Sequence, residues 1–155
     1  MFKYVLENNL GDVLAIIGAA LCFLLAGSGA AKGVSMAGKV GSGVIAEDSS
    51  KFVPVMILEA LPSTQGIYGF VVAFLIIGKV GGLSLEQGFS LIIAGLPAGV
   101  VGLISAIFQG QVAVASIGIV AKRSADMVKG VVLTLMVELF AIFALLISIL
   151  MVGKV

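Results

Sequence analysis

Four long apolar segments, separated by short polar stretches, dominate the pattern of the chain. The segments cover residues 11–38, 53–78, 88–120 and 127–152. Each exceeds the run of about 20 predominantly apolar residues that a helix needs to cross a bilayer. The segments are far longer than the strands of membrane barrels and lack the alternation of polar and apolar positions typical of such strands. The pattern therefore predicts an all-α membrane protein with four transmembrane helices.

The polar stretches between the segments are short and are expected to form turns. They cover residues 39–52, which are rich in Gly and Ser, 79–87 and 121–126. Short connections make consecutive helices antiparallel neighbours. We therefore expect two helical hairpins, the first over residues 1–78 and the second over residues 79–155.

The two hairpins resemble each other in sequence. FLIIGKV at 74–80 aligns with ILMVGKV at 149–155, whereas the first and third segments align more weakly, small residue over small residue. Chance similarity between apolar helices is the alternative, but the shared GKV ending favours a duplication. The repeat breaks at Glu138, which aligns with Ser63, so the two hairpins carry one ion-binding acid and not two.

The first and third segments carry stripes of small residues at helical spacing. These stripes are Ala15, Ala19, Cys22, Ala26, Ala30, Gly33 and Ala37, and Ala94, Ala98, Gly102, Ala106 and Gly110. Small residues let helix backbones approach closely in lipid, where packing drives helix association. The stripes fit either packing inside one four-helix bundle or an inner ring of narrow helices surrounded by the bulkier second and fourth helices, and we favour the ring.

Composition and charge remove most other classes of protein. Hydrophobic residues make up 61% of the 155 residues and charged residues 11%, against about 25% charged residues in soluble domains. The net charge of +1 gives no basic surface for nucleic acid. The chain has no His and one cysteine, Cys22, which excludes a zinc site, a disulfide framework and a His-based catalytic triad.

Basic residues predict how the helices are oriented. The first and third polar stretches and their flanks hold Lys32, Lys39, Lys51, Lys122, Arg123 and Lys129. The other side holds Lys3, Lys79 and Lys154. Because basic residues concentrate on the cytoplasmic side, we expect the first and third stretches to be cytoplasmic and both termini to lie outside.

Polar side chains on three segments fall at one depth in the bilayer. Glu138 lies about 11 residues into the fourth segment, or about 17 Å of helical rise, near the middle of a core about 30 Å thick. Gln65 and Gln109 lie equally far from the cytoplasmic ends of their own segments. An acidic side chain in the middle of a membrane is energetically costly, so its presence indicates a functional role. The alternative is that these three residues form only structural hydrogen bonds between helices.

One stripe of the second segment adds further oxygen atoms. Leu61, Thr64, Gln65 and Tyr68 share a helix face by their spacing, and Pro62 loosens the turn at its start. A backbone carbonyl there, that of Leu61, is then free to turn toward an ion. Carboxylate, amide, hydroxyl and carbonyl oxygens suit a hard cation, and one negative charge suits a monovalent one. We favour Na⁺, because a site for H⁺ alone needs little beyond the carboxyl group.

Three segments together identify a family resemblance: LPSTQGIYGFVVAFLI (61–76), FQGQVA (108–113) and MVELFAI (136–142). The chain resembles the membrane rotor subunit of V-type ATPases, a duplicated four-helix proteolipid, and most of all its sodium-translocating bacterial forms. The resemblance implies a two-layer ring of identical copies in the bacterial plasma membrane, without catalytic residues or a cofactor of its own. By the matching motif positions it implies that Na⁺ is bound by Leu61, Thr64, Gln65, Gln109 and Glu138, with Tyr68 hydrogen-bonded to Glu138.

The resemblance also implies partners. A static membrane subunit would supply an arginine opposite Glu138, since the single arginine of this chain, Arg123, lies in a polar stretch. A central stalk would contact the stretches 39–52 and 121–126, and lipid would surround the ring. ATP hydrolysis would occur on other subunits.

Some alternatives remain open. The same rotor could carry H⁺, and a small ion-coupled secondary transporter could use Glu138 as its coupling acid. A purely structural proteolipid, such as a fusion or junction channel, is a third possibility. Glu59, also within the second segment, points away from the stripe of ligands by helical phase, and is either a protonated or interface-seeking acid or an acid on the approach of the ion.

Overall fold

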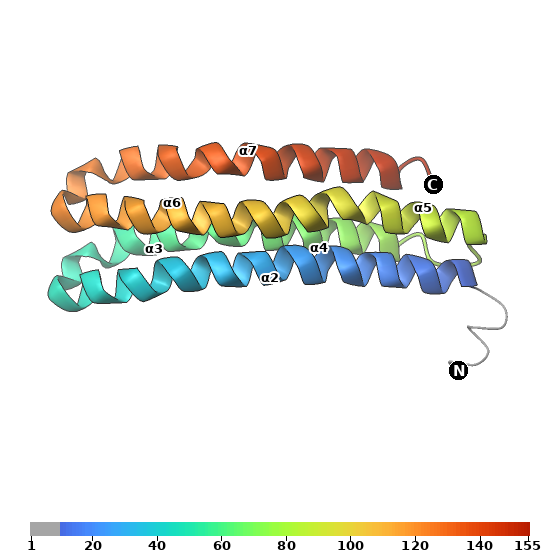
Figure 1. Ribbon diagram of the computed structural model, residues 1–155, viewed down its shortest axis with the longest axis horizontal. Helices are drawn as coiled ribbons and strands as arrows, with labels where there is room; N and C mark the ends of the chain where they lie inside the picture. The colour runs from blue at the N-terminus through green and yellow to red at the C-terminus, as the bar shows by residue number, and fades with distance from the viewer. Residues whose placement is uncertain (1–9) are drawn as a thin grey trace.

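The computed structural model describes residues 10–155 as a bundle of four long antiparallel helical rods (Figure 1). The rods consist of α2 (Leu10–Glu47), α3 (Phe52–Ala60) followed by α4 (Thr64–Ile77), α5 (Leu85–Leu96) followed by α6 (Gly102–Lys122), and α7 (Met127–Val152). Within the described residues these four rods are long and apolar enough to cross a membrane. The predicted all-α membrane fold is confirmed.

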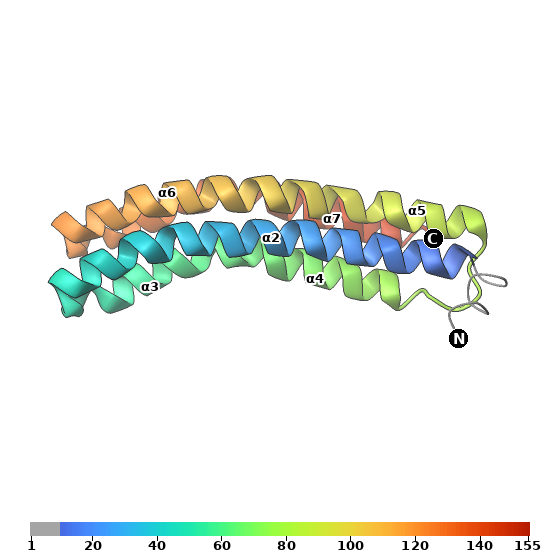
Figure 2. The ribbon, with the colours of Figure 1, turned by 60° about the horizontal axis from the view of Figure 1, so that its bottom comes forward.

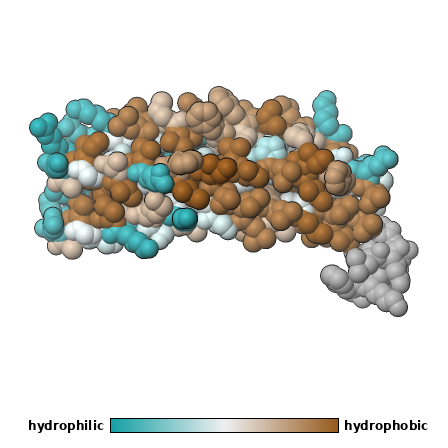
Figure 3. All heavy atoms as spheres, in the orientation of Figure 1, coloured by the Kyte–Doolittle hydropathy of each residue, from teal (hydrophilic) through white to brown (hydrophobic). Residues whose placement is uncertain are grey.

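The rods α2 and α5–α6 run in the same direction side by side, and α3–α4 and α7 run back along them (Figures 1 and 2). Figure 2 also shows that the whole bundle is gently bowed. The start of α2 and the C-terminus lie at one end, and the α2–α3 and α6–α7 turns lie at the other. Apolar residues cover most of the visible surface between the two ends of the bundle (Figure 3). Polar residues gather mainly at the ends.

The two stripes of small residues meet each other inside a single copy of the chain. Gly33 of α2 lies so close to Gly110 and to the Ala106 carbonyl of α6 that a Cβ atom at Gly33 or Gly110 would collide with the other helix. Ala15, Cys22, Ala26 and Ala37 of the first stripe and Ala94, Ala98 and Ala106 of the second are almost fully buried. Both stripes therefore take part in packing within one copy of the chain, and the inner ring of narrow helices stays a prediction.

The prediction that residues 39–52 form a turn is wrong for most of that stretch. Helix α2 continues to Glu47, and the turn itself is limited to Asp48 and a short 3₁₀ helix, Ser49–Lys51. Gly41 is buried against Val55 and Ile117. This packing outweighs the low intrinsic helix propensity of Gly and Ser, which is worth at most about 1 kcal/mol per residue.

Two polar contacts hold the short turn in place. Ser50 donates hydrogen bonds from its hydroxyl and its backbone N–H to the carboxylate of Asp48, and these bonds hold the pKa of Asp48 below its ordinary value. Lys51 reaches across to the end of α6, where its Nζ donates to the carbonyl of Ala121 at 2.7 Å. The two turns at this end of the bundle are therefore tied together.

At the opposite end, α5 begins three residues earlier than predicted. Ser84 and Gln87 form a capping box, in which each side chain bonds to the backbone N–H of the other residue. The spacing Ser-x-x-Gln is a sequence signature of a helix N-terminus. The loop before it is fixed by Asp12 of α2, whose carboxylate accepts three backbone N–H groups, from Gly81, Gly82 and Leu83.

Two prolines interrupt regular helix at mid-length. Pro62 lies in a 3₁₀ turn, Leu61–Ser63, between α3 and α4, and Pro97 opens a π-helical turn, Pro97–Val101, between α5 and α6. Proline removes one backbone hydrogen bond from a helix and crowds the preceding turn. Ser148 of α7 accepts the backbone N–H of Ala98 at 3.0 Å, next to the second interruption.

Candidate functional site

The carboxylate of Glu138 lies at the centre of a polar cluster between α4, α6 and α7. Its side chain leaves the middle of α7 and is 5% exposed. Tyr68 donates to Oε1 at 2.6 Å, while Thr64 and Gln109 lie 2.8 and 2.7 Å from Oε2 as donors. A carboxylate is an acceptor only, so the neighbours supply hydrogen atoms to both of its oxygens.

Two fully buried glutamines join α4 to α6 and α7. The side-chain amide of Gln65 donates from Nε2 to Oε1 of Gln109 at 2.7 Å. The amide of Gln109 in turn donates to Glu138 and, at 3.2 Å, to the backbone carbonyl of Thr134. Both glutamine side chains have 0% exposure. Their amide groups therefore have fixed orientations, and the Gln65 oxygen is directed toward Thr64.

Three acceptor oxygens surround the hydroxyl of Thr64. The Leu61 carbonyl, Oε1 of Gln65 and Oε2 of Glu138 lie 2.9, 3.2 and 2.8 Å from Thr64 Oγ1. A hydroxyl carries one hydrogen and can donate it to one of these three oxygens. The Leu61 carbonyl and Oε2 of Glu138 also accept hydrogen bonds from the Thr64 N–H and from Gln109. Four hard oxygen atoms thus converge on one region. A small hard cation is the ligand that such a donor set fits.

The local backbone explains why these groups converge. Pro62 is buried and packs against Gly33 of α2, which fixes the 3₁₀ turn before α4. In this turn the Leu61 carbonyl accepts the backbone N–H of Thr64 and lies 2.9 Å from its hydroxyl oxygen. Thr64 and Tyr68, four residues apart, then face Glu138 from one side of α4. The turn at Pro62 and the helix face that carries Thr64 and Tyr68 thus together direct polar groups toward Glu138.

The structure brings the six predicted site residues together. Leu61, Thr64, Gln65, Tyr68, Gln109 and Glu138 form one connected cluster. Glu59, which helical phase places away from this stripe, has its carboxylate against Gly38 of α2, on another side of the α3–α4 rod. Sequence reasoning missed Thr134, because what contacts Gln109 there is its backbone carbonyl, which no residue type signals.

Comparisons with known proteins agree with this fold. The sequence profile of the ATP synthase C-subunit family matches the chain twice, over residues 17–76 and 92–151. The chain is 41% identical over 153 residues to the V-type sodium ATPase subunit K of Enterococcus hirae, with 98% of each chain covered. It is 42% identical over 139 residues to the A-type ATP synthase subunit K of Methanocaldococcus jannaschii, with 90% of this chain and 61% of that relative covered.

Two sequence-based expectations find support in these matches. The double match to one profile fits a duplicated hairpin. The relatives confirm the resemblance that was based on the segments 61–76, 108–113 and 136–142.

Proposed function

The chain belongs to the ATP synthase C-subunit family, and from that membership we propose that it is a rotor-ring subunit of a V-type ATPase that carries Na⁺ across the membrane. It is a non-catalytic membrane subunit, and the ion is its cargo. The observation that carries the choice of ion is the convergence of oxygens from Leu61, Gln65 and Glu138 within 3.2 Å of the Thr64 hydroxyl oxygen. The name of the relative from Enterococcus hirae, a sodium ATPase subunit, supports the same ion.

In the proposed site, Na⁺ is bound by the carboxylate of Glu138 and by oxygens of Thr64, Gln65, Gln109 and the Leu61 carbonyl. Tyr68 keeps its hydrogen bond to Glu138 and orients the carboxylate. Charge neutrality supports this arrangement: one carboxylate and one monovalent cation form an uncharged unit, so the loaded site can pass through lipid at a low electrostatic cost.

Turning of the ring delivers and removes the ion. At the contact with a static membrane subunit, an arginine of that subunit pairs with Glu138 and displaces Na⁺. Arg123 of this chain does not serve that purpose, because it lies at the end of α6, about 21 Å of helical rise from Gln109. Once past the arginine, Glu138 takes up another ion and the loaded copy moves on into lipid.

The end of the bundle with the α2–α3 and α6–α7 turns is proposed to be cytoplasmic and to contact the central stalk. The excess of basic residues at that end supports this orientation. The bond from Lys51 to the Ala121 carbonyl ties the two turns together, which favours transmission of torque through a stiff joint. Both termini are then on the outer side.

The test is modification of Glu138 by a hydrophobic carbodiimide in the purified ring, with and without Na⁺. We expect Na⁺ to slow the modification, because the reagent needs a proton from the carboxyl group and a free carboxyl oxygen to attack its central carbon, and bound Na⁺ displaces that proton and occupies that oxygen. Choline chloride at equal ionic strength is the salt control. A rate that depends on pH but not on Na⁺ would show that the cargo is H⁺.

A matched pair of variants shows whether the amide oxygens take part. Gln109→Ala removes the glutamine that is bonded to Glu138, and Gln111→Ala removes an exposed glutamine two residues away on the same helix. We expect the first variant to need more Na⁺ for half-maximal protection and the second to behave like the unchanged chain. Equal protection in the two variants would mean that Gln109 contributes to helix packing and not to Na⁺ binding.

A further inference from the structure

A second buried polar cluster joins α6 to α7, one helical turn from Glu138 toward the α6–α7 turn. It consists of the hydroxyls of Ser116 and Thr134 and the carbonyl of Gly130. The hydroxyl oxygens lie 3.2 Å apart, and they lie 3.1 and 2.8 Å from the Gly130 carbonyl oxygen. Ser116 is 1% and Thr134 0% exposed. The proposed Na⁺ transport does not itself use this cluster.

The cluster is linked to the ion site through a single residue. The hydroxyl of Thr134 donates to Gly130, while the backbone carbonyl of the same residue accepts from Nε2 of Gln109 at 3.2 Å. The other hydrogen of that nitrogen goes to Oε2 of Glu138. With both hydrogens engaged, the amide cannot rotate, and its oxygen stays directed toward Gln65.

Close approach of the two helices makes the cluster possible. Gly130 has no side chain, and a Cβ atom there would lie 2.9 Å from the Cβ atom of Ser116. At this spacing the Ser116 hydroxyl reaches the backbone of α7 directly. A hydroxyl that bonds to the carbonyl four residues earlier also bends its helix slightly, which affects the direction of nearby carbonyl groups.

We propose that Ser116 and Thr134 are positioning residues for the Na⁺ site. Together they hold α7 against α6 so that the Thr134 carbonyl keeps the Gln109 amide beside Glu138 and Gln65, two of the proposed ligands. This inference rests on the proposed function, since it assigns a role in Na⁺ affinity. Groups that orient direct ligands commonly change metal affinity by factors of about 10 to 100 when they are removed.

The variants Thr134→Val and Ser116→Ala test the proposal, because both remove hydroxyls while nearly preserving volume. The measurement is the Na⁺ concentration that gives half-maximal protection of Glu138 from carbodiimide in the intact ring. We expect this concentration to rise about tenfold in each variant, the lower end of that range. Thr134→Ser retains the hydroxyl and is expected to restore the affinity of the unchanged chain.

Ser105→Ala is the matched control. Ser105 lies on the same helix as Ser116, is 5% exposed, and its hydroxyl has no partner among the residues that the structure describes. Its removal should leave the protection curve unchanged. If Ser105→Ala weakens protection as much as Ser116→Ala, the effect is general loosening of α6, and the proposal is wrong.

A double-mutant cycle separates positioning from simple stability. In a Gln109→Ala background the amide to be oriented is gone, so Thr134→Val should raise the half-protection concentration no further. Additive losses would contradict the proposal, as would normal protection in both hydroxyl variants. If Thr134→Val prevents ring assembly, the same comparison is made with Ser116→Ala, alone and combined with Gln109→Ala, and that result decides whether the proposal holds. Absence of Na⁺ protection in the unchanged ring would instead contradict the proposed function itself.

Discussion

At the scale of the residue, the environment of Glu138 decides what this carboxylate does. A lone charged side chain at the centre of a membrane costs about 2.5 kcal/mol or more. Here donors from Thr64, Tyr68 and Gln109 surround both oxygens, and charge-assisted hydrogen bonds of this kind are worth about 1.5–3 kcal/mol each. These donors therefore hold both oxygens of the Glu138 side chain in place between α4, α6 and α7.

The corresponding prediction compares two acids. Glu138→Gln keeps the size of the side chain but removes its charge, so we expect the ring to assemble and Na⁺-coupled ATPase activity of the complex to be lost. Glu59→Gln is the matched control, because the Glu59 carboxylate lies against Gly38 and not in the polar cluster. Activity assays and Na⁺ uptake into vesicles measure both variants. Normal Na⁺ transport by Glu138→Gln would end the rotor interpretation.

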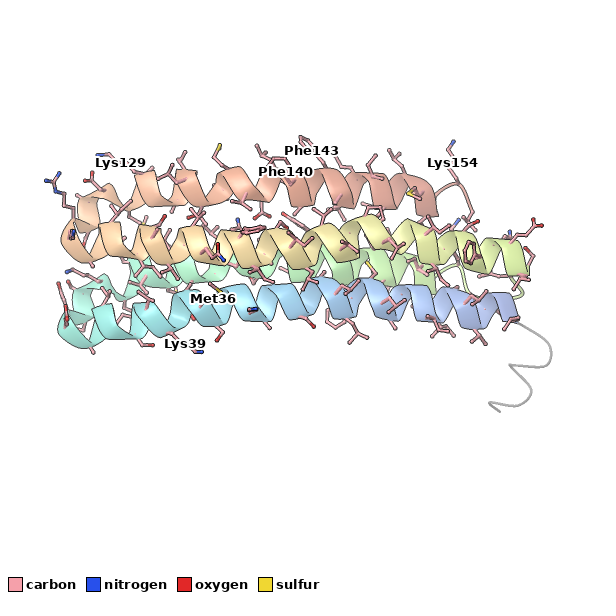
Figure 4. All side chains as sticks on the ribbon, in the orientation of Figure 1. Met36, Lys39, Lys129, Phe140, Phe143 and Lys154 are labelled. Atoms are coloured by element: carbon pink, nitrogen blue, oxygen red, sulfur yellow. The ribbon has the colours of Figure 1, made fainter. Side chains whose placement is uncertain are left out.

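At the scale of the element, the fold depends on how closely α2 and α6 approach. Gly33 and Gly110 face each other with almost no space between their backbones. The bulkier residues of α7 point outward instead: Phe140 and Phe143 are 64% and 59% exposed and project from the outer face of the bundle (Figure 4). The polar cluster lies where the narrow helices bring α4 and α7 near α6.

Two glycines of α2 test this packing. Gly33→Val places side-chain atoms onto the Ala106 carbonyl of α6, whereas Gly43→Val enters open space, with no atom within 4 Å of the new Cβ. We expect the first change to destabilise the bundle by about 1–3 kcal/mol, as overpacking does, and the second to cost far less. Thermal loss of helical signal from the detergent-solubilised protein measures both. Equal melting temperatures would contradict the close α2–α6 contact.

At the scale of the whole molecule, one copy of the chain leaves large apolar side chains exposed along its length. They include Phe70 and Phe74 of α4 and Phe108 of α6, each more than half exposed. Lipid and neighbouring copies are the surroundings that such a surface requires. Basic side chains of different rods, such as Lys39 and Lys129, point away from each other on opposite faces (Figure 4).

Native mass measurement of the detergent-solubilised protein tests the assembly. A ring subunit should give one large closed oligomer. Each copy contacts the next through two different faces, and such head-to-tail contacts end in a closed ring when the rotation from copy to copy adds up to a full circle. Mild heating should release single chains without intermediate dimers of special stability. A stable dimer as the largest species would favour the ion-coupled secondary transporter over the rotor.

The sequence by itself determined much of this protein. Runs of apolar residues of membrane-spanning length need no tertiary information, because backbone groups in lipid must be satisfied within helices. The motifs around Thr64, Gln109 and Glu138 likewise identified the polar residues at one depth, since helical rise converts position in the sequence into depth.

Only the tertiary structure decided the rest. The extension of α2 to Glu47 depends on the contact between Gly41 and Val55, which outweighs local propensity. The anchoring of the Gly81–Leu83 loop by Asp12 and of Gln109 by the Thr134 carbonyl involves backbone groups. Every residue carries such groups, so no residue type reveals which of them will meet a side chain from another helix; that is decided when the helices pack.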